Sequence, residues 1–268
     1  MTVRLATFNL LHGMRPGDGR VDGDRLARAV AELDADVLGL QEVDRGQPRS
    51  GGLDQTALVA AACGAADWRF LPALRGTPGQ DWTGAGPVGV VPDDELRAED
   101  PAGDVGPGYG VGLVSRLPVR RWWALRLPYY PIRFPVLVGG RLPLLVQDEP
   151  RVAVAAQVAL PDGGGLTVAT THLSFVPGSN LRQLRAVTRW LGRLPGPRVL
   201  LGDLNLPGRV PTLVTGWPDL VRERTHPADV PRWQLDHVLT SQLHRPVVGT
   251  AVVNLGVSDH RAVRVDLA

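Results

Sequence analysis

A buried strand ends within the stretch Leu200-Leu201-Gly202-Asp203-Leu204-Asn205-Leu206-Pro207. The apolar run before Gly202 is typical of a strand with both faces covered, and Pro207 cannot continue a sheet ladder because it lacks a backbone N–H. Side chains alternate along a strand, so Asp203 and Asn205 are predicted to point the same way, with Leu204 on the opposite face. One carboxylate and one carboxamide are therefore expected to share a pocket.

This Asp-Asn pair allows two interpretations. A carboxylate can accept a proton from water or hold a metal ion, and an amide two residues later can orient water or a phosphoryl oxygen without adding charge. The same two side chains could also simply cap a turn. Similar polar groups at the ends of other strand-like runs favour the functional interpretation.

Polar residues end or begin several further apolar runs. Residues 3–9 alternate like a strand, residues 36–42 form a continuous apolar run that ends in an acid, and residues 166–172 form a third such run. A final strand is expected to follow residues 258–261. Eight residues lie at the edges of these runs: Asn9, Glu42, His172, Asp203, Asn205, Asp236, Asp259 and His260. Oxygen and amide ligands with no Cys-rich or His-rich cluster favour Mg²⁺ or Mn²⁺ over zinc.

The rest of the chain alternates strand and helix patterns. Helices are predicted after Asp22, over residues 53–63, and from residue 179 or 180, where Asn180 and Gln183 have the spacing of a capping box. Residues 109–115 and 119–127 are predicted to pair as two strands. Residues 75–108 are rich in Gly, Pro and Asp, which predicts an irregular surface loop.

Composition limits the class of protein. The 268 residues, 44% of them hydrophobic, can bury a sizeable core, and no linker-like stretch divides them, so residues 1–268 are expected to form one domain. The formal charge of +2 does not indicate a nucleic-acid binder. The single Cys63 excludes an internal disulfide. With no signal-type apolar segment and no apolar run near the roughly 20 residues that span a bilayer, a cytoplasmic location is expected.

Bases alternate with aromatic residues over residues 120–134, which read RRWWALRLPYYPIRF. Such a segment could stack nucleobases or rest on a membrane interface. More often such a segment is an amphipathic hairpin that covers the core, so it does not by itself assign a partner.

Seven short segments occur in a fixed order along the chain: Thr7-Phe8-Asn9, Leu40-Gln41-Glu42-Val43, Gly110-Val111-Gly112-Leu113-Val114-Ser115-Arg116, Thr171-His172-Leu173, Gly202-Asp203-Leu204-Asn205, Leu235-Asp236-His237 and Ser258-Asp259-His260. In this order they resemble the motifs of the endonuclease/exonuclease/phosphatase superfamily, which includes deoxyribonuclease I, deadenylases, sphingomyelinases and inositol-polyphosphate 5-phosphatases. The resemblance covers nearly the whole chain. It implies an α/β (α+β) fold, a four-layer α/β/β/α sandwich of two mixed β-sheets flanked by helices.

The resemblance also implies roles for the strand-end residues. Glu42 is expected to bind the divalent ion, with Asn9 nearby and Asp259 as a further or water-mediated ligand. Asp203 would position or deprotonate the attacking water, and Asn205 would hold that water or the phosphate. The remaining three are expected to meet the charge that builds on the phosphoryl oxygens: His172, His260 and, through His260, Asp236. His237 follows Asp236 on a strand and is expected to face away.

The sequence differs in two respects from the members of this superfamily that act on DNA. Leu11 stands where apurinic endonucleases place an additional acid, which puts a second metal position in doubt. No basic loop matches a duplex-clamping insertion, which weakens a DNA-repair function.

The sequence therefore favours a Mg²⁺-dependent (or Mn²⁺-dependent) phosphodiesterase, foremost a nuclease, with a phosphate-ester substrate, nucleic acid in the first place. The alternative is a phosphatase or phospholipase-type enzyme acting on inositol phosphates or phospholipid head groups at a membrane. A non-catalytic binding module is a third possibility, disfavoured because Glu42, Asp203 and His260 are all present. No obligate protein partner is expected.

Overall fold

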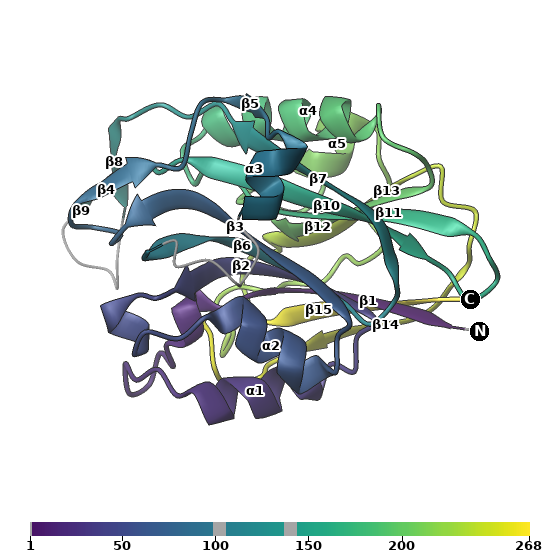
Figure 1. Cartoon of the computed structure of the whole chain (residues 1–268), viewed down its shortest axis with the longest axis horizontal. Coiled ribbons are helices and arrows are strands. Elements are labelled where there is room, and N and C mark those ends of the chain that lie inside the picture. The colour runs from purple at the N-terminus through teal and green to yellow at the C-terminus, as the bar shows by residue number, and fades with distance from the viewer. Residues whose placement is uncertain (1, 99–105, 137–143) are drawn as a thin grey trace.

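Two β-sheets stack face to face between two layers of helices (Figure 1). The computed structural model describes residues 2–98, 106–136 and 144–268. Helices α1 (Gly23–Ala31) and α2 (Gln55–Cys63) cover the outer face of one sheet, and α4 (Ser179–Leu191) and α5 (Val210–Thr215) cover the other. This confirms the predicted four-layer sandwich. In the described part of the chain, no helix has both the length and the apolarity needed to cross a membrane.

Each sheet contains parallel and antiparallel neighbours. The first has the order β14-β15-β1-β2-β6-β3-β4, with β14 Val247–Val253, β15 Ala262–Leu267, β1 Val3–Asn9, β2 Val37–Arg45, β6 Gly108–Ser115, β3 Asp67–Gly76 and β4 Trp82–Gly84. The second has the order β13-β12-β11-β10-β7-β5, with β13 Asp236–Ser241, β12 Arg198–Asp203, β11 Gly165–His172, β10 Arg151–Ala159, β7 Val119–Leu127 and β5 Gly89–Val90. A separate hairpin pairs β8 (Arg133–Val136) with β9 (Leu144–Gln147).

Two parallel strand pairs bring polar residues to one edge of the sandwich. Strand β1 runs parallel to β2 after the crossover through α1, and Asn9 lies opposite Gln41. Strand β11 runs parallel to β12 after the crossover through α4, and His172 lies opposite Asp203. Because parallel strands end at the same edge of a sheet, each crossover places two functional side chains together.

The two sheets approach closely just below that edge. A Cβ atom at Gly39 would lie 2.7 Å from Oγ1 of Thr170 in the facing sheet, so this position has no room for a side chain. The buried amide of Gln41 donates to Thr7 Oγ1 (3.0 Å) and to Thr170 Oγ1 (2.8 Å). A hydrogen-bonded bridge therefore ties the two sheets together beneath the polar cluster.

Strand β12 has both faces covered, as its apolar run predicted. Val199 and Leu201 pack in the core between the sheets, and Leu200 packs against Leu184 of α4. All four side chains are fully buried. The alternation fixes the register of the strand, and with it the direction of Asp203.

Several local predictions were wrong. Residues 109–115 and 119–127 do not pair with each other, because β6 belongs to the first sheet and β7 to the second. Residues 75–108 are not one irregular loop: they contain β4, β5 and the short helix α3 (Asp93–Ala98), although residues 99–105 lie outside the described part. The capping box is absent, because Gln183 Oε1 instead accepts from the backbone N–H of Ser174 (2.8 Å). Strand β14 was not predicted.

Candidate active site

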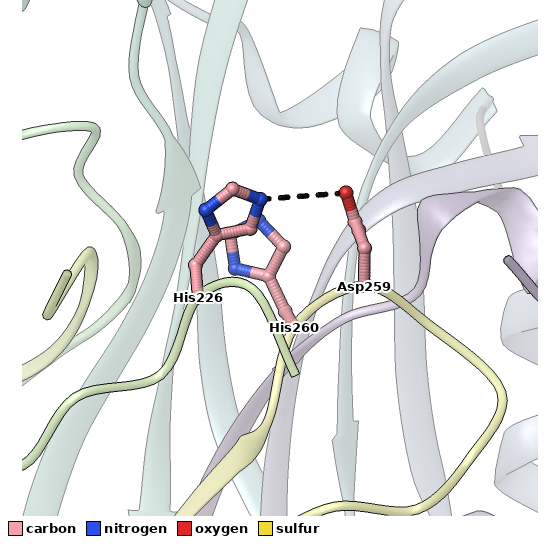
Figure 2. Close-up of side chains that lie close together, drawn as sticks. All are labelled: His226, Asp259 and His260. Atoms are coloured by element: carbon pink, nitrogen blue, oxygen red, sulfur yellow. Dashed lines mark ion pairs between the residues drawn. The ribbon is translucent and has the colours of Figure 1, made fainter. Parts of the chain in front are cut away.

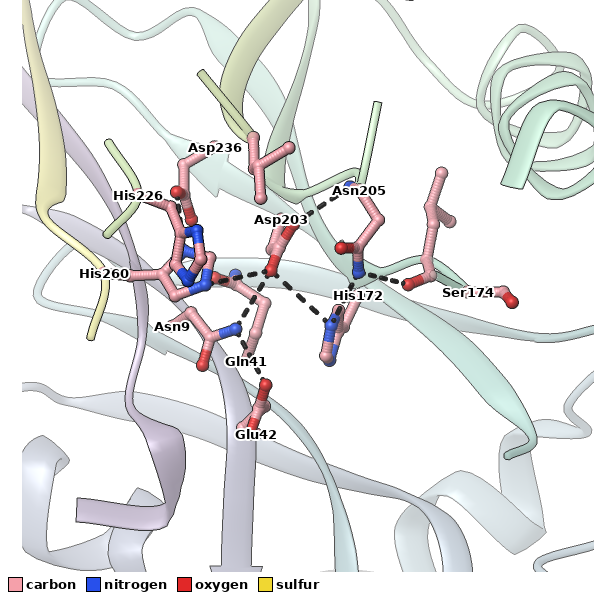
Figure 3. Close-up of polar contacts among 12 residues, drawn as sticks. Asn9, Gln41, Glu42, His172, Ser174, Asp203, Asn205, His226, Asp236 and His260 are labelled. Atoms are coloured by element: carbon pink, nitrogen blue, oxygen red, sulfur yellow. Dashed lines mark hydrogen bonds and ion pairs between the residues drawn. The ribbon is translucent and has the colours of Figure 1, made fainter. Parts of the chain in front are cut away.

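Glu42 lies on a β-bulge, and the prediction that its strand ends there was wrong. Strand β2 continues to Arg45, and its pairing with β6 shifts register between Leu40 and Val43. Glu42 has a φ of 53°, a conformation uncommon outside glycine. A bulge redirects one side chain without ending the strand. Here it directs the Glu42 carboxylate toward the ends of β1 and β12 (Figure 3).

Asn9 connects the two acids at the centre of the cluster. Its Nδ2 donates to Glu42 Oε1 (3.1 Å) and to Asp203 Oδ2 (3.0 Å) (Figure 3). Its Oδ1 accepts from the backbone N–H of Leu11 (3.0 Å). The side chain of Asn9 is therefore fixed at both ends, and it holds Glu42 and Asp203 in a defined relation to each other.

The side chains of Asp203 and Asn205 both approach Nε2 of His172, but not by the predicted strand alternation, because β12 ends at Asp203 and Asn205 has a φ of 49°. Asp203 Oδ1 accepts from the backbone N–H of Asn205 (2.9 Å), and Oδ2 lies 3.6 Å from Nε2 of both His172 and His260. Gly202 precedes Asp203 with a φ of 149°, and a Cβ atom there would meet Thr171 O at 2.1 Å. Burial raises the pKa of Asp203, with a further increase from Asp236, against the opposing effect of His260. A raised pKa makes this carboxylate a better proton acceptor.

His260 forms a buried ion pair with Asp236. Its Nδ1 donates to Asp236 Oδ2 at 2.8 Å. Burial alone would lower the pKa of His260, but Asp236, Asp203 and Asp259 together raise it to about 10. The ring is therefore an imidazolium at neutral pH, with Nε2–H facing Asp203.

His226 is a member of the cluster that the sequence did not indicate. Its ring centroid lies 4.6 Å from that of His260, and its Nε2 lies 3.5 Å from Asp259 Oδ2 (Figure 2). Burial tends to raise the pKa of Asp259, but His226 and His260 lower it overall. His226 comes from a Pro-rich segment with no periodicity, so only the folded structure brings it to the site.

Arg151 was also missed. It is the first residue of β10, and its Nη1 lies 2.9 Å from Nδ1 of His172, the residue that ends β11. Both side chains are buried. An Arg at the start of an otherwise apolar strand was the available signal, because a buried guanidinium requires a partner.

His237 lies outside the cluster, as expected. It is fully buried, its Nδ1 is 2.6 Å from Asp219 Oδ2, and its Nε2 is 2.8 Å from Leu206 O. Both ring nitrogens thus have oxygen partners in the core, which indicates a structural role.

All eight residues predicted from strand ends lie in one connected cluster, extended by His226 and Arg151. The cluster contains four carboxylates, from Glu42, Asp203, Asp236 and Asp259. Burial raises the pKa of Glu42 to about 6, and the neighbouring Asp259 and Asp203 act in the same direction. Among the described residues, buried Asp236 Oδ1 has no hydrogen-bond partner.

This donor set fits a divalent cation. Ligand atoms of Asp203, Asp236 and His260 lie within 4.8 Å of one another, as do those of His226, Asp259 and His260. Glu42 belongs to neither group, and a protonated His260 offers no lone pair, so neither group is by itself a complete set of ligands. Crowded carboxylates that raise one another's pKa are relieved by a metal ion, and oxygen-rich sites suit Mg²⁺ or Mn²⁺. The amide oxygen of Asn9 accepts one hydrogen bond, from Leu11 N–H, which leaves one lone pair for a cation.

Solved structures with the same fold include several phosphoesterases. An endonuclease/exonuclease/phosphatase from Beutenbergia cavernae DSM 12333 is 25% identical, with a TM-score of 0.66 over 99% of this chain and 71% of that one. The mannosyl-6-phosphatase Bt3783 of Bacteroides thetaiotaomicron VPI-5482 is 16% identical, with a TM-score of 0.63 over 99% of each chain. D. rerio TDP2 complexed with single-strand DNA product is 17% identical, with a TM-score of 0.53 over 100% of this chain and 99% of that one.

A search of curated protein sequences gave no significant match. The sequence profile of the Endonuclease/Exonuclease/phosphatase family, in contrast, matches residues 6–260, from the strand that ends in Asn9 to His260 itself. The chain therefore belongs to the endonuclease/exonuclease/phosphatase family, whose members are metal-dependent phosphoester hydrolases.

Proposed function

We propose that the chain is a divalent-metal-dependent phosphodiesterase that cleaves nucleic acid, single-stranded in the first place. We choose a diester as the substrate because of the charge balance of the site. The charge of Arg151 is offset by Glu149, 3.9 Å away, so a divalent cation and the His260 imidazolium bring three positive charges against the four carboxylates. A dianionic phosphomonoester calls for surplus positive charge, whereas a monoanionic diester needs less.

Each residue of the site has a separate role in the proposed reaction. Asp203 accepts the proton of the attacking water, because its pKa is raised and its carboxylate faces the centre of the cluster. His260 donates from Nε2 to the phosphoryl group as negative charge develops, and Asp236 keeps its ring oriented and charged. The metal ion, held by Glu42 with Asp259 as a second acid, would neutralise charge on the phosphoryl oxygens.

A depression beside the site supports nucleic acid as the substrate. It has a volume of about 890 Å³ and is lined by Trp82 and Tyr129, with Gln80 and Gln147 among its polar groups. Tyr129 lies two residues beyond Leu127, the register partner of Arg151, and Gln147 lies four residues before Arg151, so both chain segments lead from the depression to the Arg151 side of the site. Stacking of a base on an aromatic ring contributes about 1–3 kcal/mol and tolerates any sequence.

A second candidate is a phosphodiester of a lipid head group. The β8–β9 hairpin and the segment before it expose Tyr130 (45%), Ile132 (46%) and Leu145 (60%), with Arg133 beside them. The same segment, residues 129–149, supplies Asp148 and Glu149 next to Arg151. Exposed apolar and basic side chains near an active site are typical of membrane-surface binding.

One activity panel separates these functions. It contains single-stranded DNA, RNA, bis-p-nitrophenyl phosphate, sphingomyelin vesicles and mannose 6-phosphate, each with Mg²⁺ and with chelator. Trp82→Ala and Leu145→Ala serve as reciprocal controls. Nucleic-acid cleavage that weakens in Trp82→Ala but not in Leu145→Ala supports the proposal. The reverse pattern on vesicles supports the lipid alternative, and activity on the monoester alone contradicts both.

A further inference from the structure

One N–H group approaches each ring nitrogen of His172, and each of them requires a lone pair on the nitrogen that it faces. Arg151 Nη1 approaches Nδ1 at 2.9 Å, and Asn205 Nδ2 approaches Nε2 at 3.2 Å. Both neighbours are N–H donors, and a neutral imidazole offers only one acceptor nitrogen. One of the two contacts is therefore a hydrogen bond, and the other is only a close approach.

The Arg151 contact is the stronger of the two. It is shorter and charge-assisted, and hydrogen bonds from a charged donor are roughly twice as strong as neutral ones. Arg151 and His172 are 5% and 6% exposed, so water does not replace either partner. Asn205 Nδ2 already donates to Leu173 O at 2.9 Å, so its amide does not depend on His172.

The buried guanidinium also forms an ion pair with Glu149. That carboxylate lies 3.9 Å from Nη2, a longer contact than the one between Nη1 and His172. Arginine has five donors and no acceptor, and it stays protonated at all accessible pH values. Nδ1 of His172 must therefore present a lone pair, and the single ring proton is placed on Nε2.

We propose that Arg151 is a positioning residue that fixes His172 as the neutral Nε2–H tautomer, so that His172 serves as a hydrogen-bond donor and not as a proton source. Its Nε2–H faces Asp203 Oδ2 at 3.6 Å, on the side where the substrate would bind. His172 and His260 then differ in their charge. His260, paired with an acid, is a charged donor, and His172, paired with a cation, is a neutral one.

The electrostatic surroundings agree with this assignment. Burial, Arg151 and His260 all lower the pKa of His172 well below its ordinary value. The titratable and charged groups around it come from four strands or their edges: Arg151 and Glu149 at β10, Asp203 of β12, Tyr109 of β6, and His260 before β15.

Histidine ring ¹⁵N NMR on the whole protein tests the tautomer without any substrate. The chain has six histidines, and His172→Gln identifies the signals of this one by their loss. We expect a deprotonated Nδ1 and a protonated Nε2, unchanged from pH 8 to about pH 5. An Nδ1–H tautomer, or an imidazolium near pH 7, would overturn the proposal.

Two variants test the role of Arg151. In Arg151→Met, His172 should lose its fixed tautomer and gain a titration in the same pH range, whereas Arg151→Lys, which keeps a charged donor, should preserve the wild-type spectrum. An unchanged His172 spectrum in Arg151→Met contradicts the proposal, and if that variant does not fold, the wild-type and Arg151→Lys spectra still decide the tautomer.

The consequence for catalysis rests on the proposed phosphodiesterase function. Turnover should fall about 10–100-fold in Arg151→Met, the range for partners that orient an active-site histidine, with kcat more affected than KM. Partial recovery in Arg151→Lys is expected. A protein that hydrolyses none of the panel substrates would contradict the proposed function but leave the NMR result standing, so the two failures are distinguishable.

Discussion

Nδ1 of His260 lies 2.8 Å from a carboxylate oxygen of Asp236, and both side chains are buried. This pair makes the two residues act as one unit, because Asp236 orients the ring and keeps it charged. We expect Asp236→Ala and His260→Ala each to reduce kcat strongly, and the double variant to be little worse than His260→Ala. A double-mutant cycle on kcat/KM measures this coupling. Fully additive losses would show that the two side chains act independently.

Because of the same pair, the folding stability should decrease at alkaline pH. The pKa of His260 is raised to about 10 in the folded protein, above its ordinary value of 6.5. The stabilisation is therefore complete below about pH 6.5 and is lost as pH rises toward 10, with a limiting slope of about 1.4 kcal/mol per pH unit. Urea unfolding with chelator present, at pH 6.5, 8 and 9.5, measures the trend. His260→Gln should flatten it, and an equally steep trend in that variant would assign it to other groups.

Glu42→Gln should weaken Mg²⁺ binding and lower turnover by orders of magnitude while the fold is kept. The amide retains the shape of the side chain but loses the charge that attracts the cation. Because burial raises the pKa of Glu42 to about 6, Mg²⁺ affinity of the wild type should also decrease as pH falls below 6. Calorimetric titration measures both effects, with Glu32→Gln on the exposed end of α1 as the control. Unchanged Mg²⁺ affinity in Glu42→Gln would remove Glu42 from the metal site.

Gly202→Ala should destabilise the protein by about 3 kcal/mol or more, since it combines a strained φ of 149° with a contact of 2.1 Å to the backbone of Thr171. Gly163→Ala is a matched control, because Gly163 also has a positive φ, of 86°, but no atom within 4 Å of the added Cβ. We expect the control to lose only about 1 kcal/mol. Urea unfolding of the three proteins measures the difference, and equal losses would show that conformation alone, not the contact, requires glycine at 202.

Much of the fold and site was predictable because the order of apolar and polar residues indicates which side chains are buried. The run before Gly202 predicted a strand covered on both faces, and Val199, Leu200 and Leu201 are fully buried. The polar residues at the ends of such runs then met at one edge, since both parallel pairs end there. Periodicity thus identified the strands and the side chains at their ends.

Partners and local irregularities were not predictable in the same way. Periodicity shows which face of a strand is buried, but not which strand lies beside it. Residues 109–115 and 119–127 were predicted to pair because a short turn joins them, yet they belong to different sheets. The bulge at Glu42 depends on how β2 meets β6, which no local pattern records. His226 and Arg151 join the site through side-chain contacts with His260 and His172, which lie on other elements of the fold.

Asp203→Asn tests whether Asp203 is a general base or a metal ligand, and the structure shows which hydrogen bonds the substitution also disturbs. Asp203 Oδ1 accepts from Asn205 N–H and Oδ2 accepts from Asn9 Nδ2, so an amide in Asp203→Asn must turn its NH₂ toward one of two donors. The combined variant Asn9→Asp with Asp203→Asn restores an acceptor opposite that NH₂ and moves the charge to residue 9, at the cost of the hydrogen bond to Glu42 Oε1. Its turnover tests whether a negative charge near residue 203 can replace the base.

If Asp203 is the general base, Asp203→Asn should lose about 10²–10⁴-fold in turnover and retain Mg²⁺ affinity. The combined variant should then recover no activity, since a carboxylate on β1 does not occupy the position of Asp203 between His172 and His260. Loss of Mg²⁺ affinity in Asp203→Asn would instead make Asp203 a metal ligand. Recovery of turnover in the combined variant would show that the site needs one negative charge there and not a base at residue 203, so calorimetry and turnover together distinguish the three roles.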